Sequence, residues 1–90
     1  YRDLTRILMD AADDLCGGRL VLSHEGGYSA AYVPYCGLAV METLTGRRTS
    51  VTDPWLPLMT EWGQQALQPH QEAAIDRAAA LLPRIGGPVG

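Results

Sequence analysis

Residues 19–28 read RLVLSHEGGY, and this stretch decides the fold that the sequence predicts. Its apolar run, residues 20–22, is continuous rather than alternating. A continuous run is typical of a strand that is covered on both faces, as in a parallel sheet. The glycine pair Gly26-Gly27 then predicts a loop that turns tightly. Because ligands in open α/β sheets lie beyond the carboxyl ends of the strands, we expect this loop to face a ligand site.

One helix is predicted on each side of this strand and loop. Residues 4–15 place apolar side chains on one helical face and charged side chains on the other, and Gly17-Gly18 ends the pattern. A second helix is predicted to begin near Pro34, since proline is favoured in a first turn, and to end at Thr45-Gly46. The order helix, buried strand, glycine loop and helix is typical of an α/β layer fold.

The second helix is predicted to be largely buried. Only Glu42 and Thr43 interrupt the apolar surface of its second half. Gly37, which has no side chain, would let the helix lie close against a sheet.

The chain offers one convincing strand, and a lone strand leaves its backbone donors and acceptors unpaired. We therefore expect residues elsewhere to complete the sheet, and we interpret the chain as a fragment of a larger domain. It also lacks an initiator Met, which predicts that the protein begins upstream.

The composition changes in the middle of the chain, where Thr, Ser, Asp and Pro predict a connector over the surface. Two shorter helices are predicted to follow. One spans residues 58–67, and the other begins at Pro69 and is ended by the proline- and glycine-rich residues 83–88. We therefore divide the chain into residues 1–46, a helix–strand–loop–helix unit, and residues 47–90, a connector with helices for packing or oligomerisation.

Bulk composition excludes several classes of function. The net charge is −3 and the seven basic residues, all arginine, are scattered along the sequence, so there is no basic stripe for nucleic acid. Apolar stretches are interrupted too often for a membrane span. Cys16 and Cys36 lack metal-site spacing, and we interpret them as reduced thiols of a cytoplasmic protein.

Tyr28 is the residue of the loop with the clearest chemical potential. Its phenol is neutral at working pH and can donate a hydrogen bond to a developing oxyanion. It can equally cap a turn or pack at a sheet edge, and spacing alone favours that structural role.

A family resemblance decides between these two roles. Residues 22–28, LSHEGGY, are followed by a small-residue helix that ends in Leu44-Thr45-Gly46. This succession resembles the final strand–loop–helix of zinc-dependent histone deacetylases, above all the class II-like bacterial histone deacetylase-like amidohydrolases and acetylpolyamine amidohydrolases. Residues 32–40, YVPYCGLAV, strengthen the bacterial amidohydrolase assignment. The resemblance covers the first half of the chain strongly, and the tail only in being helical.

The resemblance implies a fold, a reaction and a role for Tyr28. The fold is the open, mostly parallel-sheet α/β fold of the arginase/deacetylase type, of which this chain would be the C-terminal part. The reaction is the removal of acetyl groups from acetyl-lysine or acetylpolyamine by a single Zn²⁺, held by two Asp and one His that would all lie upstream. Tyr28 would donate to the acetyl oxygen as it becomes tetrahedral. The residues themselves, apart from the resemblance, predict that Gly26 and Gly27 bring the backbone close to the substrate, and that Glu25 either holds the loop through backbone donors or answers an upstream charge.

The remaining candidate residues are given structural roles. No metal ligand is expected in this chain, since His24, His70 and the cysteines do not form a ligand set by spacing. We expect His24 to support the loop and His70 to be solvated. Trp55 and Trp62 are expected to pack in a core or, as the second possibility, in a subunit contact of a homo-oligomer. The remainder of the deacetylase domain is the expected partner.

Two other functions stay open. The segment could serve as a non-catalytic helical interaction or oligomerisation element. It could also belong to a relative with the same architecture that hydrolyses ureas with two manganese ions. The tyrosine donor has no obvious place in that chemistry, so we rank ureohydrolysis last.

Overall fold

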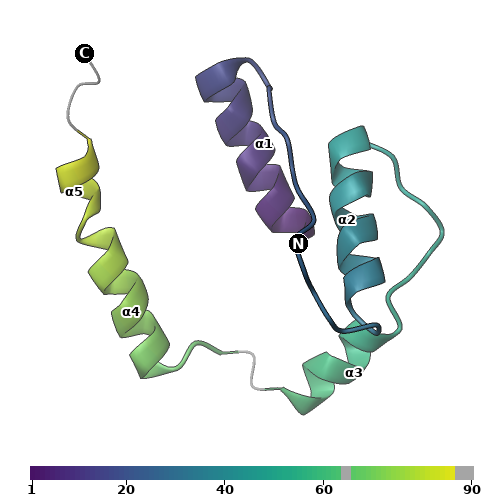
Figure 1. Cartoon of the computed structure of the whole chain (residues 1–90). Helices are drawn as coiled ribbons and strands as arrows, with labels where there is room; N and C mark the ends of the chain where they lie inside the picture. Colours follow the sequence, from purple (N-terminus) through teal and green to yellow (C-terminus); the bar gives the residue numbers. More distant parts are fainter. Residues whose placement is uncertain (64–65, 87–90) are drawn as a thin grey trace. The chain divides into compact units, whose positions relative to one another are not determined.

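The computed structural model describes residues 1–63 and 66–86, and these residues form helices joined by extended segments (Figure 1). The described part contains no strand. The predicted open, mostly parallel-sheet α/β fold of the arginase/deacetylase type is therefore wrong for this chain, which is helical. The helices are α1 (Arg2–Cys16), α2 (Val33–Thr45), α3 (Trp55–Trp62), α4 (Pro69–Ala79) and α5 (Leu82–Ile85).

The predicted strand is the element that fails, and its failure has a physical cause. Residues 19–29 have no regular secondary structure, and the described residues provide no neighbouring strand with which they could exchange hydrogen bonds. A strand is defined by those bonds, whereas a run of apolar residues reports only a tendency to be covered. The apolar run is not buried by other described residues either, because Val21 is 93% exposed.

The sequence predicts four helices at about the right places, but the third lies earlier than predicted: α3 spans Trp55–Trp62, and Ala66 and Leu67, which the prediction included, are not helical. The helices α1 and α2 each end at a glycine in the left-handed conformation, Gly17 with φ of 63° and Gly46 with φ of 66°. Helix α4 begins at Pro69 as predicted, behind a capping box formed by Gln68 and Gln71. Its pattern is interrupted after Ala79, so the last predicted helix is divided into α4 and α5. The predicted end at residues 87–88 lies outside the described residues.

The chain divides into two compact units, residues 1–59 and residues 60–90. In the first unit α1 packs against α2. Figure 1 shows both helices running in the same direction, with residues 19–29 leading the chain back from the end of α1 to the start of α2. The functional division that we predict after Gly46 stays a prediction.

The contact between α1 and α2 buries few side chains, and most of these are polar. Thr5 and Thr43 are each 3% exposed, and each donates its hydroxyl to a carbonyl oxygen one turn earlier in its own helix. Ala12 and Glu42 are the other buried residues in the described part of the chain. No buried side-chain nitrogen or oxygen there lacks a hydrogen-bond partner. The contact is therefore small and polar, and fully satisfied.

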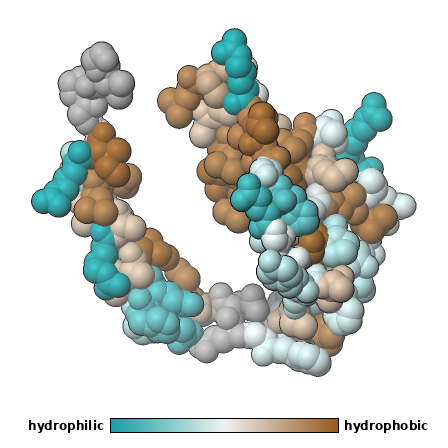
Figure 2. Space-filling model, in the orientation of Figure 1, coloured by the Kyte–Doolittle hydropathy of each residue, from teal (hydrophilic) through white to brown (hydrophobic). Residues whose placement is uncertain are grey.

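Most large apolar side chains, in contrast, are exposed. Figure 2 shows apolar residues gathered over α1, where Leu4, Ile7 and Leu15 are between 61% and 86% exposed. Helix α2 is not largely buried as predicted, because Met41 is 63% exposed and only its two polar interruptions are buried. The predicted close packing of α2 at Gly37 is also wrong for the described structure, because a Cβ added there would have no heavy atom within 4 Å. The apolar faces that the sequence marks for a core are thus left uncovered by the described residues.

The second unit repeats this pattern on a smaller scale. No residue of α4 or α5 is buried, and Ile75, Leu82 and Ile85 are more than half exposed. Trp62, which we expected to pack, is 73% exposed, while Trp55 in the first unit is 37% exposed. Among the described helices, none has both the length and the apolar character needed to cross a membrane.

Candidate functional site

The first unit contains an open groove between α1, α2 and the loop that joins them. Its volume is about 970 Å³. The side chains of α1 and α2 that line it are mainly apolar, and residues 22–29 form its third side. The lining includes Leu4 and Leu8 from α1, Val33, Cys36, Val40 and Leu44 from α2, and Glu25, Gly26, Gly27 and Tyr28 from the loop. The structure therefore brings every site residue that the sequence predicts into one groove.

The glycine pair gives the loop its course. Gly26 and Gly27 have φ of 85° and 98°, a conformation that side chains disfavour. A Cβ added to Gly27 would lie 2.9 Å from Cγ2 of Val33, the first residue of α2. A Cβ added to Gly26 would meet nothing closer than the Tyr28 hydroxyl at 3.9 Å. Gly26 is thus required by backbone conformation alone, and Gly27 also by its close approach to α2.

The loop is joined to α2 by hydrogen bonds as well. The backbone N–H of Val33 donates to the carbonyl oxygen of Ser29 over 3.0 Å. The N–H of Tyr32 donates both to that oxygen and to the Ser29 hydroxyl, over 3.2 and 3.3 Å. These hydrogen bonds, together with the close approach of Gly27 to Val33, hold the loop against the first turn of α2.

Tyr28 stands at the rim of the groove with its side chain 99% exposed. Its hydroxyl has no hydrogen-bond partner within the described part of the chain, so it is free to donate to a molecule in the groove. The structural role favoured by spacing, a turn cap or a packed sheet edge, finds no contact here. The catalytic role of Tyr28 stays a prediction.

The other polar residues of the loop act locally. The Ser23 hydroxyl donates to Oε1 of Glu25 over 3.2 Å, so Glu25 contacts a hydroxyl of its own loop rather than backbone donors. The Nε2 atom of His24 lies 3.7 Å from the position that a Cβ of Gly27 would take. His24 therefore lies beside Gly27 within the loop, and its structural role stays a prediction.

The described residues gather no group of three or more His, Cys, Asp or Glu side chains that could hold a metal ion. Cys16 is exposed, and its thiol donates to the carbonyl oxygen of Arg19, while Cys36 is half-buried and also free. His70 is exposed in α4, within the other unit. These donors do not fit a zinc centre, and no step through a metal is assigned to the residues of this chain.

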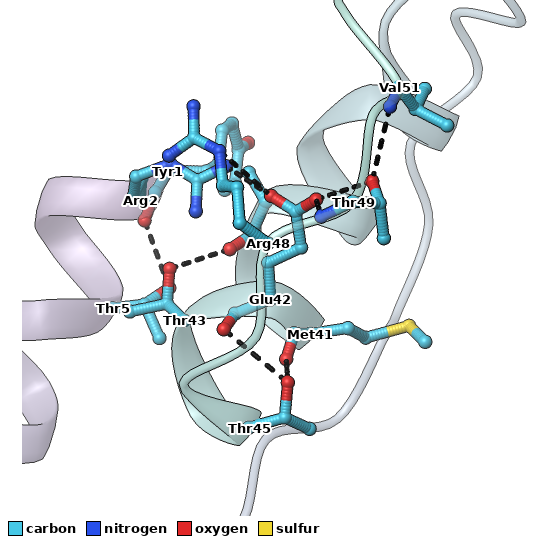
Figure 3. A network of polar contacts seen from close by, with 11 residues as sticks. Tyr1, Arg2, Thr5, Met41, Glu42, Thr43, Thr45, Arg48, Thr49 and Val51 are labelled. Carbon is cyan, nitrogen blue, oxygen red and sulfur yellow. Dashed lines mark hydrogen bonds and ion pairs between the residues drawn. The ribbon is translucent and has the colours of Figure 1, made fainter.

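The most connected polar residue is one that sequence reasoning treated only as an interruption (Figure 3). The Glu42 side chain is 4% exposed. Its Oε2 accepts a bond of 2.5 Å from Nη2 of Arg2 and lies 3.7 Å from Nε of Arg48. Its Oε1 accepts from the Thr49 N–H over 2.7 Å and from the Thr49 hydroxyl over 2.5 Å. We call Glu42, Arg2, Arg48 and Thr49 the Glu42 clasp.

The clasp changes the acidity of its central carboxyl. Hydrogen bonds from the Thr49 hydroxyl, from Arg2 and from the Thr49 N–H lower the pKa of Glu42 from 4.5 to about 2. The carboxylate is therefore ionised at any physiological pH. The signal that could have revealed it is a charged residue on the otherwise apolar face of α2, which needs a partner when it is buried.

Arginines that are scattered along the sequence also meet in space. Arg2, Arg6, Arg47 and Arg48 line a small cavity of about 180 Å³ beside Glu42. The sequence could not show this, because the residues lie on two segments about forty positions apart. Two of the four, Arg2 and Arg48, already pair with Glu42.

Comparison with known proteins adds evidence that is independent of the geometry. No model of a protein family matches the chain. A curated protein, the histone deacetylase-like amidohydrolase of Pseudomonas aeruginosa strain PAO1, is 59% identical to it over 54 residues. The match covers 60% of this chain but only 14% of that protein, so the chain spans a small part of the relative's length. Over this stretch, the resemblance to the histone deacetylase-like family that the Glu-Gly-Gly-Tyr loop predicted is confirmed.

Proposed function

We propose that this chain is part of a zinc-dependent amidohydrolase that removes acetyl groups from acetylated amines, and that Tyr28 is its oxyanion donor. The observation that carries the proposal is an unpartnered phenol at the rim of a groove, in a chain that is 59% identical over 54 residues to a histone deacetylase-like amidohydrolase. Acetyl-lysine and acetylpolyamines are the proposed substrates.

The chemistry assigned to Tyr28 is donation of one hydrogen bond. During amide hydrolysis the carbonyl oxygen gains negative charge, and a fixed neutral donor stabilises that charge more in the transition state than in the substrate. Gly26 and Gly27 leave the backbone beside Tyr28 without side chains, so a flat acetyl group can approach it. A zinc ion, when bound by residues outside this chain, would supply Lewis-acid polarisation of the same carbonyl.

The remainder of a longer polypeptide is the proposed source of the metal ligands and of the missing core. Two observations support this: the chain matches 14% of its relative's length, and its apolar helix faces are uncovered in the described residues. A cytoplasmic location is part of the same proposal and is supported by the two free thiols, Cys16 and Cys36.

The test is Tyr28→Phe in the full-length protein, assayed on an acetyl-lysine peptide. Loss of one preorganised donor is expected to lower kcat by about 10²- to 10³-fold. Tyr35→Phe is the matched control, because Tyr35 lies in α2 outside the lining of the groove and loses the same atom. An unchanged kcat in Tyr28→Phe would remove Tyr28 from the mechanism.

A second candidate function is a helical interaction or oligomerisation element. The observation that favours it is the exposed apolar surface of the second unit, with Trp62, Leu82 and Ile85. The full-length protein should be truncated after Met59, at the boundary of the units, because a cut after Gly46 would also remove Thr49 from Glu42. Light scattering that shows the same assembly state for both proteins would contradict this candidate.

A further inference from the structure

We propose that Glu42 is a positioning residue, which fixes the loop that carries Tyr28 by holding α2 in place. The inference deepens the proposed function, and it depends on the catalytic role of Tyr28 only where it concerns rates. The proposed effect of Glu42 depends on two contacts, which lie at opposite ends of α2.

The first contact is the clasp itself. One carboxylate ties together three parts of the first unit: the start of α1 through Arg2, the second half of α2 through its own backbone, and the segment after α2 through Thr49. The acceptor of these hydrogen bonds is a charged carboxylate. Because the Glu42 side chain is only 4% exposed, water competes weakly with its donors. The surrounding contact between α1 and α2 buries little apolar area, and the clasp is therefore a main restraint on the spacing of the two helices.

The second contact is at the beginning of α2, where Val33 approaches Gly27. Helix α2 is a continuous stretch of thirteen residues, Val33–Thr45, and transmits a shift at one end to the other. The hydrogen bonds from Tyr32 and Val33 to Ser29 hold the loop at the same end of α2, and beyond these contacts little else holds it within the described residues. It has no neighbouring strand, and its own Ser23–Glu25 bond is local and exposed.

Movement of α2 would therefore move the loop with it. The groove has α1 on one side, α2 on another and the loop on the third, so a change in the spacing of α1 and α2 alters where Tyr28 stands over the groove. Glu42 does not line this groove and has no contact with a substrate there. Its effect on catalysis would be indirect, through the loop.

The first experiment measures the loop without reference to activity. Hydrogen exchange is compared between the full-length protein and its Glu42→Gln variant, and the peptide that covers residues 22–29 is followed. Gln keeps the shape of the side chain, but its one neutral oxygen can accept either from Thr49 or from Arg2, and its NH2 group then faces the other donor. Exchange of the loop amides is expected to rise on the order of tenfold. Unchanged loop exchange would overturn the proposal, even if α1 and α2 themselves exchange faster.

Two further variants keep the experiment decisive. Thr49→Val leaves the Arg2 pair and the Thr49 backbone bond intact, and should raise loop exchange in the same peptide by a smaller factor if Glu42→Gln does not fold. Glu61→Gln is the matched control, because it makes the same change of charge at an exposed position in α3 and should leave residues 22–29 unaffected. An equal rise in Glu61→Gln would contradict the assignment to Glu42.

The second experiment asks whether Glu42 acts through Tyr28. The kcat is measured for Glu42→Gln, Tyr28→Phe and the double variant on an acetyl-lysine peptide. If Glu42 positions Tyr28, Glu42→Gln should lower kcat, and this loss should disappear when Tyr28→Phe is already present. Losses that multiply would refute positioning through Tyr28. An unaltered kcat in Tyr28→Phe alone would instead refute the proposed function, and the exchange experiment would still decide the role of the clasp.

Discussion

The close approach of Gly27 to Val33 allows one prediction to be developed in detail. The perturbation is Gly27→Ala in the full-length protein. Two costs act together, because Ala must adopt a φ of 98° and its Cβ must fit 2.9 Å from Cγ2 of Val33. A residue held in a glycine conformation costs about 1–3 kcal/mol, and an overpacked methyl group typically costs another 1–3 kcal/mol. We therefore expect a total destabilisation of about 2–6 kcal/mol, as the sum of these two terms.

Gly26→Ala separates the two costs. Gly26 has a similar φ of 85°, but an added Cβ would meet nothing closer than 3.9 Å. It should therefore show the conformational cost alone, about 1–3 kcal/mol. Val33→Ala in the Gly27→Ala background should recover the packing cost, so the two substitutions are expected to be non-additive by about 1–3 kcal/mol.

The assay is urea unfolding of the full-length variants, with kcat measured in parallel. If Gly27→Ala and Gly26→Ala unfold at the same denaturant concentration, Gly27 does not rest on α2 and the reasoning is refuted. Additivity of Gly27→Ala and Val33→Ala would refute it independently.

Two other predictions concern charge and metal. Because the folded pKa of Glu42, about 2, lies below its ordinary value of 4.5, its ionised form stabilises the fold above about pH 4.5, and this contribution is lost as pH falls toward 2. The difference in unfolding free energy between the full-length protein and Glu42→Gln should therefore be constant from pH 5 to 7 and shrink between about pH 4.5 and 2; a difference that grows in that interval would contradict the clasp. For the proposed zinc enzyme, a chelator should abolish deacetylation and added Zn²⁺ should restore it, while Tyr28→Phe should keep its full metal content. Loss of metal in Tyr28→Phe would show that the variant fails through the metal site rather than as a hydrogen-bond donor.

The local signals in the sequence were read correctly, and they concern short stretches of chain. The apolar spacing of residues 4–15 predicted α1, and Gly17 and Gly46 marked the ends of α1 and α2. The glycine-rich loop at Gly26-Gly27 is also present, although it follows no strand, and the catalytic role of its tyrosine stays a prediction. Each of these signals depends on backbone preferences within a few residues, so it does not require knowledge of what else is nearby.

The predictions that failed concern features that depend on residues far away in the sequence. The run at residues 20–22 has the composition of a buried strand, but a strand requires a second strand for its hydrogen bonds, and none is found among the described residues. The apolar surface of α2 predicted burial, whereas the described structure buries Glu42 and Thr43 and exposes Met41. In both cases the side-chain pattern indicates a preference for burial, and residues 1–63 and 66–86 do not supply the covering side chains.

By itself, the sequence determined where α1 and α2 end and where α4 begins, that a glycine-rich loop carries Tyr28, and which family this stretch resembles. Only the tertiary structure decided that Arg2, forty positions away, meets Glu42, that Thr49 completes the clasp, and that Val33 supports Gly27. The reason is physical. Helix caps and turns follow from the backbone preferences of neighbouring residues, whereas a buried carboxylate is stable only where separate segments bring donors to it in three dimensions.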